Sequence, residues 1–260
     1  MPTKLGQNFL VNKDIAKKIV EAAELKPDDV VLEIGPGKGI LTEELAKKAG
    51  KVIAVEIDGN LVEILENKFK NKKNVEIIKG DVLQLTTYNL QLTTYKIVAN
   101  LPYYITSPVI RKFLESENPP SKMILMLQKE VAERIVASSG KMSILAVSVQ
   151  YYAQPQVIFN VPRENFDPAP EVDSAVIHIK TLKQENIKTK EQKSKESKKF
   201  FRVVKAGFCA KRKTLINNLA NSFHLEKKEV EEKLKRVGIS SRTRAQELSV
   251  KDWKKLAELF

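Results

Sequence analysis

The 260-residue sequence is poor in the residues that bind metals or form disulfides. It contains one cysteine, Cys209, and two histidines, His178 and His224, so no internal disulfide is possible and no spacing typical of a metal site exists. No apolar run reaches the roughly 20 residues of a membrane-spanning helix, and residues 1–10 lack the pattern of a secretory signal. These absences predict a cytoplasmic globular protein with no metal and no membrane partner.

Positive charge is concentrated in the last third of the sequence. Lysine and arginine outnumber aspartate and glutamate by 22 to 10 in residues 181–260 (+12), but only by 23 to 22 in residues 1–180 (+1). A basic excess confined to one segment is typical of proteins that bind a polyanion, most often nucleic acid, although a solvated surface is the alternative. The consecutive Lys211, Arg212 and Lys213 are the candidate phosphate contacts, with a solvated helix start as the other interpretation.

The first two-thirds of the sequence alternates short β-branched runs with helical patterns. Apolar residues at helical spacing occupy 41–49, 60–69 and 107–116, between strands predicted at 29–35, 51–58, 75–81, 95–100 and 122–128. This alternation implies right-handed crossovers and a parallel sheet covered on both faces. Residues 155–161 and 172–179 are predicted strands without an intervening helix, so we expect them to pair antiparallel at the sheet edge.

A second, helical region follows the predicted sheet. The lysine-rich stretch 180–199 has no apolar period and is interpreted as a linker leading into a helix. Helical patterns then occupy 200–208, 212–223, 227–238 and 250–260, with Gly238 placed to end the third. We therefore predict a Rossmann-like α/β domain over residues 1–182 and a small all-helical domain over residues 183–260.

The segment EIGPGKG places Gly35, Gly37 and Gly39 where the first strand turns into a helix. Glycines at this turn let the backbone approach a ligand, and the helix N-terminus favours groups that accept hydrogen bonds. Ile40 stands where the G-x-G-x-x-G fingerprint of NAD enzymes requires glycine. The G-x-G-x-G variant found here is the one used by enzymes that bind S-adenosyl-L-methionine.

Polar residues end the next three strands. Glu56 lies 21 positions after Gly35, Asp81 ends the third strand, and Asn100 ends the fourth. Open α/β sheets bind ligands at this carboxyl edge. Glu56 is placed to accept hydrogen bonds from two ribose hydroxyls, although an exposed acid at a strand end is the simpler interpretation of that residue alone. Asp81 is suited to accept from an adenine amino group.

The segment NLPYYITSP, residues 100–108, follows the fourth strand directly. By itself it is consistent with an ordinary strand-end loop. In a methyltransferase, the Asn100 amide oxygen and the Leu101 carbonyl would accept both N–H bonds of an adenine N6 and orient its lone pair toward a methyl donor. Pro102 would stiffen the turn, and Tyr103 would offer a face on which a flipped base stacks. Such catalysis depends on positioning rather than on a base.

The sequence resembles the small-subunit ribosomal RNA adenine dimethyltransferases, which make two adjacent N6,N6-dimethyladenosines near the 3′ end of that RNA. The resemblance rests on GQNFL (6–10), EIGPGKGILT, VEID, GD at Gly80, NLPYYITSP, QKEVAERI (128–135), FDPAPEVDSAV (166–176) and RKTLINNL (212–219). It implies a monomer that acts on the small ribosomal subunit or its precursor. It also implies that Phe166 sandwiches the target adenine opposite Tyr103, and that S-adenosyl-L-methionine contacts Asn8, Leu10, Gly35, Glu56, Asp81 and Asn100.

Two alternatives share much of this pattern. The sister family that methylates a large-subunit adenine and confers macrolide resistance has the same glycine loop, but RKTLINNL and NLPYYITSP favour the small-subunit family. A non-catalytic RNA-binding assembly or transcription factor on this scaffold is less consistent with the intact set of site residues. The sequence departs from the family at residues 142–146, where MSILA replaces Y-G-x-L-S, and this predicts altered packing beside the target pocket.

Overall fold

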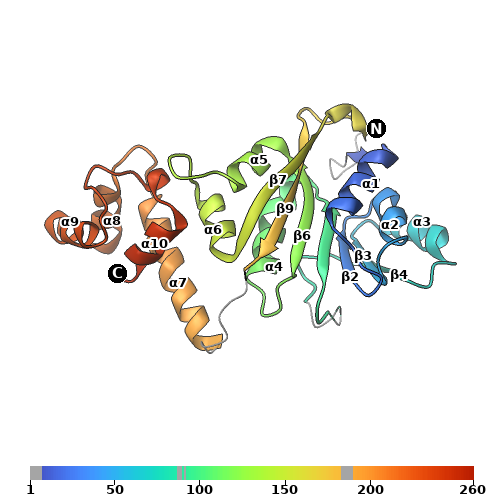
Figure 1. The fold of residues 1–260 in the computed structure, drawn as a ribbon, viewed down its shortest axis with the longest axis horizontal. Helices are drawn as coiled ribbons and strands as arrows, with labels where there is room; N and C mark the ends of the chain where they lie inside the picture. The colour runs from blue at the N-terminus through green and yellow to red at the C-terminus, as the bar shows by residue number, and fades with distance from the viewer. Residues whose placement is uncertain (1–7, 87–89, 91, 183–189) are drawn as a thin grey trace. The chain divides into compact units, whose positions relative to one another are not determined.

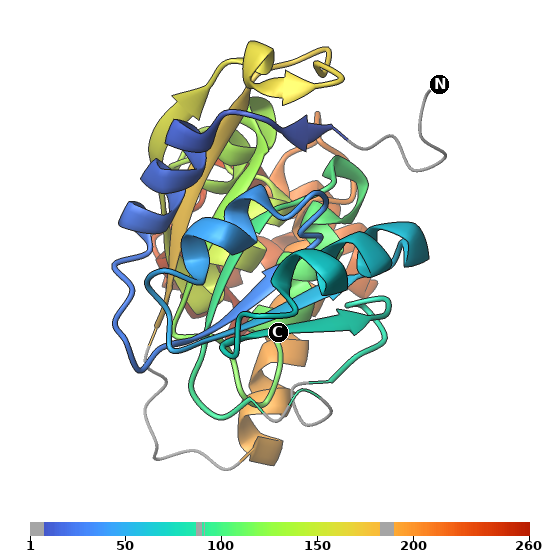
Figure 2. The same cartoon turned by 90° about the vertical axis from the view of Figure 1, so that its right-hand side faces the viewer.

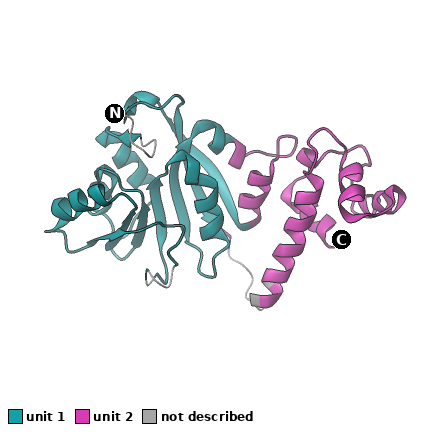
Figure 3. Cartoon of the chain, turned by 180° about the vertical axis from the view of Figure 1, so that it is seen from behind, with its two compact units in different colours: residues 1–133, 152–181 teal, residues 134–151, 182–260 magenta. Residues whose placement is uncertain are grey.

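The computed structural model describes residues 8–86, 90, 92–182 and 190–260. The chain forms two compact units, one made of residues 1–133 and 152–181 and the other of residues 134–151 and 182–260 (Figure 3). This division differs from the boundary predicted after residue 182, because residues 134–151 group with the second unit. The predicted domain boundary at residue 182 stays a prediction.

A seven-stranded sheet forms the centre of the first unit (Figure 1). Its order is β4-β3-β2-β5-β6-β9-β7, with parallel pairing from β4 to β6 and antiparallel pairing of β9 with both β6 and β7. The strands are β2 (Val30–Ile34), β3 (Lys51–Glu56), β4 (Val75–Lys79), β5 (Lys96–Asn100), β6 (Lys122–Gln128), β7 (Ala153–Val161) and β9 (Ser174–Thr181). The predicted α/β fold and the antiparallel edge pair are confirmed.

Helices line this sheet, as the alternating pattern predicted (Figure 2). The predicted helices are α2 (Ile40–Leu45), α3 (Gly59–Phe69) and α4 (Thr106–Leu114), and α1 (Lys13–Ala22) is an additional helix of this unit. The helix α5 (Lys129–Ile135) crosses the boundary between the units, and α6 (Ile144–Tyr152) belongs to the second unit except for Tyr152. Ile19 of α1 and Leu45 of α2 share one core cluster with Val31 and Val98 of the sheet. The alternate residues Leu32 and Ile97 are equally buried, so both faces are covered.

A two-stranded sheet joins the N-terminal segment to a distant loop. β1 (Phe9–Leu10) pairs antiparallel with β8 (Phe166–Asp167), so that Leu10 lies opposite Phe166. Beside it, the Asn12 Nδ2 donates to Asn165 Oδ1 over 2.7 Å, while Asn12 Oδ1 caps the start of α1. Residues separated by more than 150 positions are thereby brought to the same place.

The second unit is helical. It contains α7 (Lys190–Gly207), α8 (Leu215–Phe223), α9 (Lys227–Arg236) and α10 (Val250–Ala257), together with the short 3₁₀ turn η3 (Ala245–Glu247). Gly238, at φ 74°, follows α9 and confirms the predicted stop. Within the described residues, none of the helices combines the length and the apolar character that a bilayer crossing requires.

One prediction about the second unit is wrong. The stretch 180–199 is not a linker throughout, because β9 extends to Thr181 and α7 begins at Lys190; residues 183–189 lie outside the described residues. Lysine, glutamate and glutamine favour helix, so α7 starts before its apolar repeat does. Met142 and Ala146 of the departure at 142–146 pack in the core of the second unit with Phe200 and Trp253, and its effect on the target pocket stays a prediction.

Candidate active site

The glycine loop connects β2 to α2 in a conformation that requires glycine. Gly35, Gly37 and Gly39 have φ values of 66°, 57° and 75°, in the left-handed region that other residues rarely adopt. A Cβ on Gly37 would stand 2.9 Å from the Phe9 ring, so a side chain there is excluded by space as well. The Gly35 amide donates to the Val55 carbonyl over 3.0 Å, which ties the loop to β3.

Glu56 is held rigidly at the end of β3. The residue is only 2 % exposed, and its Oε2 accepts a hydrogen bond from the Gly37 amide over 3.2 Å. Oε1 accepts from the amides of Ile57 and Asp58 over 2.9 and 3.1 Å. A carboxylate offers about four lone-pair sites, so about one remains available for a ligand.

Glu33 is a buried acid that the sequence analysis did not select. It lies in β2, is 1 % exposed, and burial together with the nearby Glu56 raises its pKa to about 8. Its Oε2, and Oγ1 of the buried Thr42, have no hydrogen-bond partner among the described residues. The signal was present in the sequence, because a carboxylate interrupts the apolar strand VVLEI.

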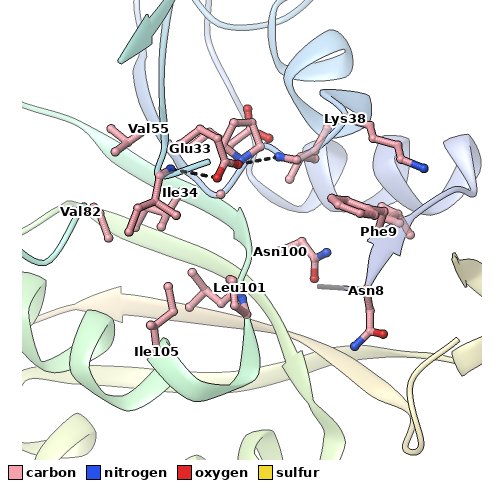
Figure 4. Close-up of a pocket in the computed structure, with 18 of the residues that line it drawn as sticks. Asn8, Phe9, Glu33, Ile34, Lys38, Val55, Val82, Asn100, Leu101 and Ile105 are labelled. Carbon is pink, nitrogen blue, oxygen red and sulfur yellow. Dashed lines mark hydrogen bonds between the residues drawn. The ribbon is translucent and has the colours of Figure 1, made fainter. Parts of the chain in front are cut away.

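These residues open onto one cavity in the first unit, which Figure 4 shows with Asn100 between the Val55 and Val82 end and the Phe9 and Lys38 end. The structure brings the cofactor candidates and the catalytic candidates together in its lining: Asn8, Leu10, Gly35, Gly37, Glu56, Asp81, Asn100, Leu101, Pro102, Tyr103 and Phe166. Gly6 and Gln7 of the GQNFL segment lie outside the described residues.

The basic triplet is not part of this cavity. Lys211, Arg212 and Lys213 are exposed residues of the second unit, in the turn between α7 and Thr214, which precedes α8. They therefore do not begin that helix. None of their side chains makes an ion pair with another residue in the described ranges.

The segment after β5 is a stiff turn with a free amide. The Leu101 amide donates to the Met126 carbonyl over 3.0 Å, and the Ile105 amide donates to the Pro102 carbonyl over 3.1 Å. The Pro102 ring lies against the glycine loop, 3.7 Å from where a Gly35 Cβ would stand. In the part of the chain that the structure describes, the Asn100 side chain makes no hydrogen bond, so its amide is available to a ligand.

Two aromatic rings line the cavity and come from segments far apart in the sequence. Tyr103 belongs to the turn η1 (Tyr103–Ile105), and its hydroxyl lies 3.2 Å from Oγ of the fully buried Ser174 in β9. Burial raises the pKa of Tyr103, which keeps its phenol neutral. Phe166, 5 % exposed, comes from β8 and is held by the pairing with Leu10.

The lining suits a nucleoside with a cationic amino-acid tail. Ile34, Val55 and Val82 form apolar walls, and Glu56 and Asp81 supply acceptors at the ends of their strands. Glu33, whose Oε2 has no hydrogen-bond partner among the described residues, also lines the cavity and offers a further polar group to a ligand. S-Adenosyl-L-methionine has this chemistry, so the residues present fit it. Together with the Rossmann-like sheet, the cavity defines an α/β methyltransferase.

Comparison with known proteins identifies the family. Residues 1–260 match ribosomal RNA adenine dimethylase along their whole length. Ribosomal RNA small subunit methyltransferase A of Dehalococcoides mccartyi is 45% identical over 254 residues, covering 97% of this chain and 86% of that protein. The protein of the same name from Fusobacterium nucleatum is 42% identical over 259 residues, covering 99% and 96%. The chain belongs to the ribosomal RNA adenine dimethylase family.

Solved structures of similar fold include a dimethyladenosine transferase and a 23S rRNA methyltransferase. A dimethyladenosine transferase from Plasmodium falciparum has a TM-score of 0.79 at 27% identity, with 95% of each chain covered. The 23S rRNA methyltransferase ErmE has a TM-score of 0.78 at 27% identity, covering 97% of this chain and 99% of that one. The backbone alone therefore does not separate these two kinds of enzyme, whereas the sequence relatives favour the small-subunit enzyme over the large-subunit enzyme and the non-catalytic factor.

Proposed function

We propose that the protein transfers methyl groups from S-adenosyl-L-methionine to N6 of two adjacent adenosines near the 3′ end of small-subunit rRNA. The observation that carries this proposal is the Asn100 amide, which has no partner among the described residues and stands in one cavity with the glycine loop, Tyr103 and Phe166.

The cofactor is held by the loop and the strand ends. Gly35 and Gly37 leave room for its methionine part, Glu56 accepts from ribose, and Asp81 accepts from the adenine amino group. Asn8 and Leu10 close the cavity from the N-terminal side. When bound, S-adenosyl-L-methionine supplies an electrophilic methyl group on a sulfonium.

The chain's own part in the reaction is to position the target adenine. Asn100 Oδ1 and the Leu101 carbonyl accept the two N6–H bonds and turn the nitrogen lone pair into line with the methyl group. Tyr103 and Phe166 hold the flipped ring between their faces. An amide does not take up a proton at neutral pH, so the proton leaves to water after transfer and the acceleration comes from alignment.

The small ribosomal subunit or its precursor is the proposed partner. A basic surface, defined here as Lys211, Arg212 and Lys213, is exposed on the second unit and is available to RNA phosphates. Affinity would come from this charge and specificity from the cavity. We propose that the protein acts as a monomer in the cytoplasm, where the subunits assemble.

The experiment is methylation of unmodified ribosomal particles. Small and large subunits from cells that lack this activity are incubated separately with labelled S-adenosyl-L-methionine, and the rRNA is digested and analysed by mass. We expect label only in the small-subunit RNA, as dimethyladenosine at two adjacent positions. Label confined to the large subunit would replace the proposal with the function of ErmE, and no label on either particle would favour a non-catalytic factor.

A further inference from the structure

Two neighbouring tyrosines in the same turn differ in their surroundings. Tyr103 is half-buried and hydrogen-bonded to Ser174. Tyr104 is 61% exposed, the highest value among the exposed large hydrophobic residues in the described ranges, yet it also lines the cavity. In the same part of the chain its side chain makes no hydrogen bond and no ring contact. Packing therefore does not explain why an aromatic ring stands at this rim.

The backbone beneath Tyr104 is fixed even though its ring is free. The turn is anchored by the Leu101 and Ile105 amides and is followed at once by α4, whose first residue, Thr106, is buried. A ring on such a turn loses little conformational freedom when it binds a flat partner. A tyrosine ring at the rim of a cavity offers a flat face on which a nucleic-acid base of any identity can stack.

We propose that Tyr104 stacks on the base of the nucleotide next to the flipped adenosine. This inference rests on the proposed function. When an adenine leaves its stack to enter the cavity, the neighbouring base loses a partner on one face. The Tyr104 ring, one residue from the ring that holds the target, replaces that partner. Because the two target adenosines are adjacent, the neighbour is an adenine in at least one of the two reactions.

A pairing of protein and RNA changes tests this contact. The substrate is a small subunit reconstituted with rRNA whose 3′ segment is a ligated synthetic oligonucleotide, carrying either the intact neighbour or an abasic site on its 5′ or 3′ side. Tyr104→Ala should lower kcat/KM by about 5- to 150-fold, the equivalent of ~1–3 kcal/mol for one stacked base. Tyr104→Phe and Tyr104→Trp should keep near wild-type rates, since both retain a face.

The abasic substrate gives the decisive readout. On one of the two abasic substrates, the kcat/KM of wild type should fall by the same factor as that of Tyr104→Ala on intact RNA. The kcat/KM of Tyr104→Ala should be the same on that abasic substrate as on intact RNA. Ile64→Ala is the matched control, because Ile64 is 52% exposed on α3 but does not line the cavity. Its rate should be unchanged on every substrate.

Three results would overturn the inference. The first is a wild-type kcat/KM for Tyr104→Ala. The second is a further fall in the kcat/KM of Tyr104→Ala on both abasic substrates, by the same factors as for wild type. The third is weaker cofactor binding by Tyr104→Ala, which would place the ring against the cofactor. In each case wild type still methylates intact particles, so the proposed function stands. If wild type methylates neither adenosine, both proposals are overturned.

Discussion

The cavity of the first unit and the basic surface of the second differ in how much a single residue contributes. In the cavity, each polar group has a fixed position: Glu56 accepts hydrogen bonds from three backbone amides, and Asn100 ends β5 within the lining. The basic surface consists of exposed cations within a segment of net charge +12, against +1 for residues 1–180. Under the proposed function, catalysis depends on the position of single groups, whereas RNA affinity depends on the number of cations.

The sharpest test of this contrast is Asn100→Ala. If the amide orients the adenine amino group, single-turnover methylation of small-subunit particles should fall by at least ~100-fold, because misaligned reactants lose the proximity advantage. RNA binding, measured by filter retention, should hardly change, since one amide contributes little beside many phosphate contacts. A near-normal rate would mean that the turn after β5 is only a turn.

The next largest effect should come from Glu56→Ala. Loss of its acceptor should weaken S-adenosyl-L-methionine binding by ~1–3 kcal/mol, as measured by calorimetry. The carboxylate also accepts from the amides of Gly37, Ile57 and Asp58, so the loop should loosen too. Glu56→Gln, which keeps the shape and part of the bonding, should lie between wild type and Ala. Unchanged affinity in both variants would place the cofactor elsewhere.

Removing charge from the basic surface should produce a smaller, graded loss of RNA affinity. Replacing Lys211, Arg212 and Lys213 by glutamine should lower RNA affinity and flatten its dependence on salt, by up to ~3 in the slope of log affinity against log salt. Cofactor affinity should stay at the wild-type value. Lys70, Lys72 and Lys73 are exposed in the first unit and provide a control with the same change in charge. Equal salt slopes for the two triple variants would rule out a specific role for the basic surface.

The last test concerns the buried Glu33 of the cavity, whose pH dependence affects stability rather than methylation. Its pKa is raised by burial from 4.5 to about 8, so the folded state holds a proton that the unfolded state releases across that window. The contribution of Glu33 to stability is therefore complete below pH 4.5 and declines as pH rises to about 8, by at most ~1.4 kcal/mol per pH unit. Urea unfolding from pH 5 to 8 should show a flatter profile for Glu33→Gln than for wild type. Parallel profiles would contradict a protonated Glu33.

Much of the fold and the lining of the cavity could be predicted from the sequence. Helical and strand periods predicted the seven strands of the large sheet and the helices α2, α3 and α4, but not α1, α5 or α6. The residues that end β3 and β5, Glu56 and Asn100, line one cavity as expected from parallel strands. The prediction failed where local composition was ambiguous, as in α7, whose lysine-rich start resembles a linker. Whether the predicted site residues perform their assigned roles stays a prediction.

The sequence by itself determined the alternation of strands and helices, the glycine loop and the polar strand ends, because these depend on periods and spacings within a few residues. Only the tertiary structure decided the contacts between distant segments: the pairing of Leu10 with Phe166, the bond between Tyr103 and Ser174, and the burial that raises the pKa of Glu33. It also showed that Tyr103 is half-buried and Tyr104 exposed, although the two are adjacent residues of the same type. Burial and partners depend on the whole packed chain, and no local pattern records them.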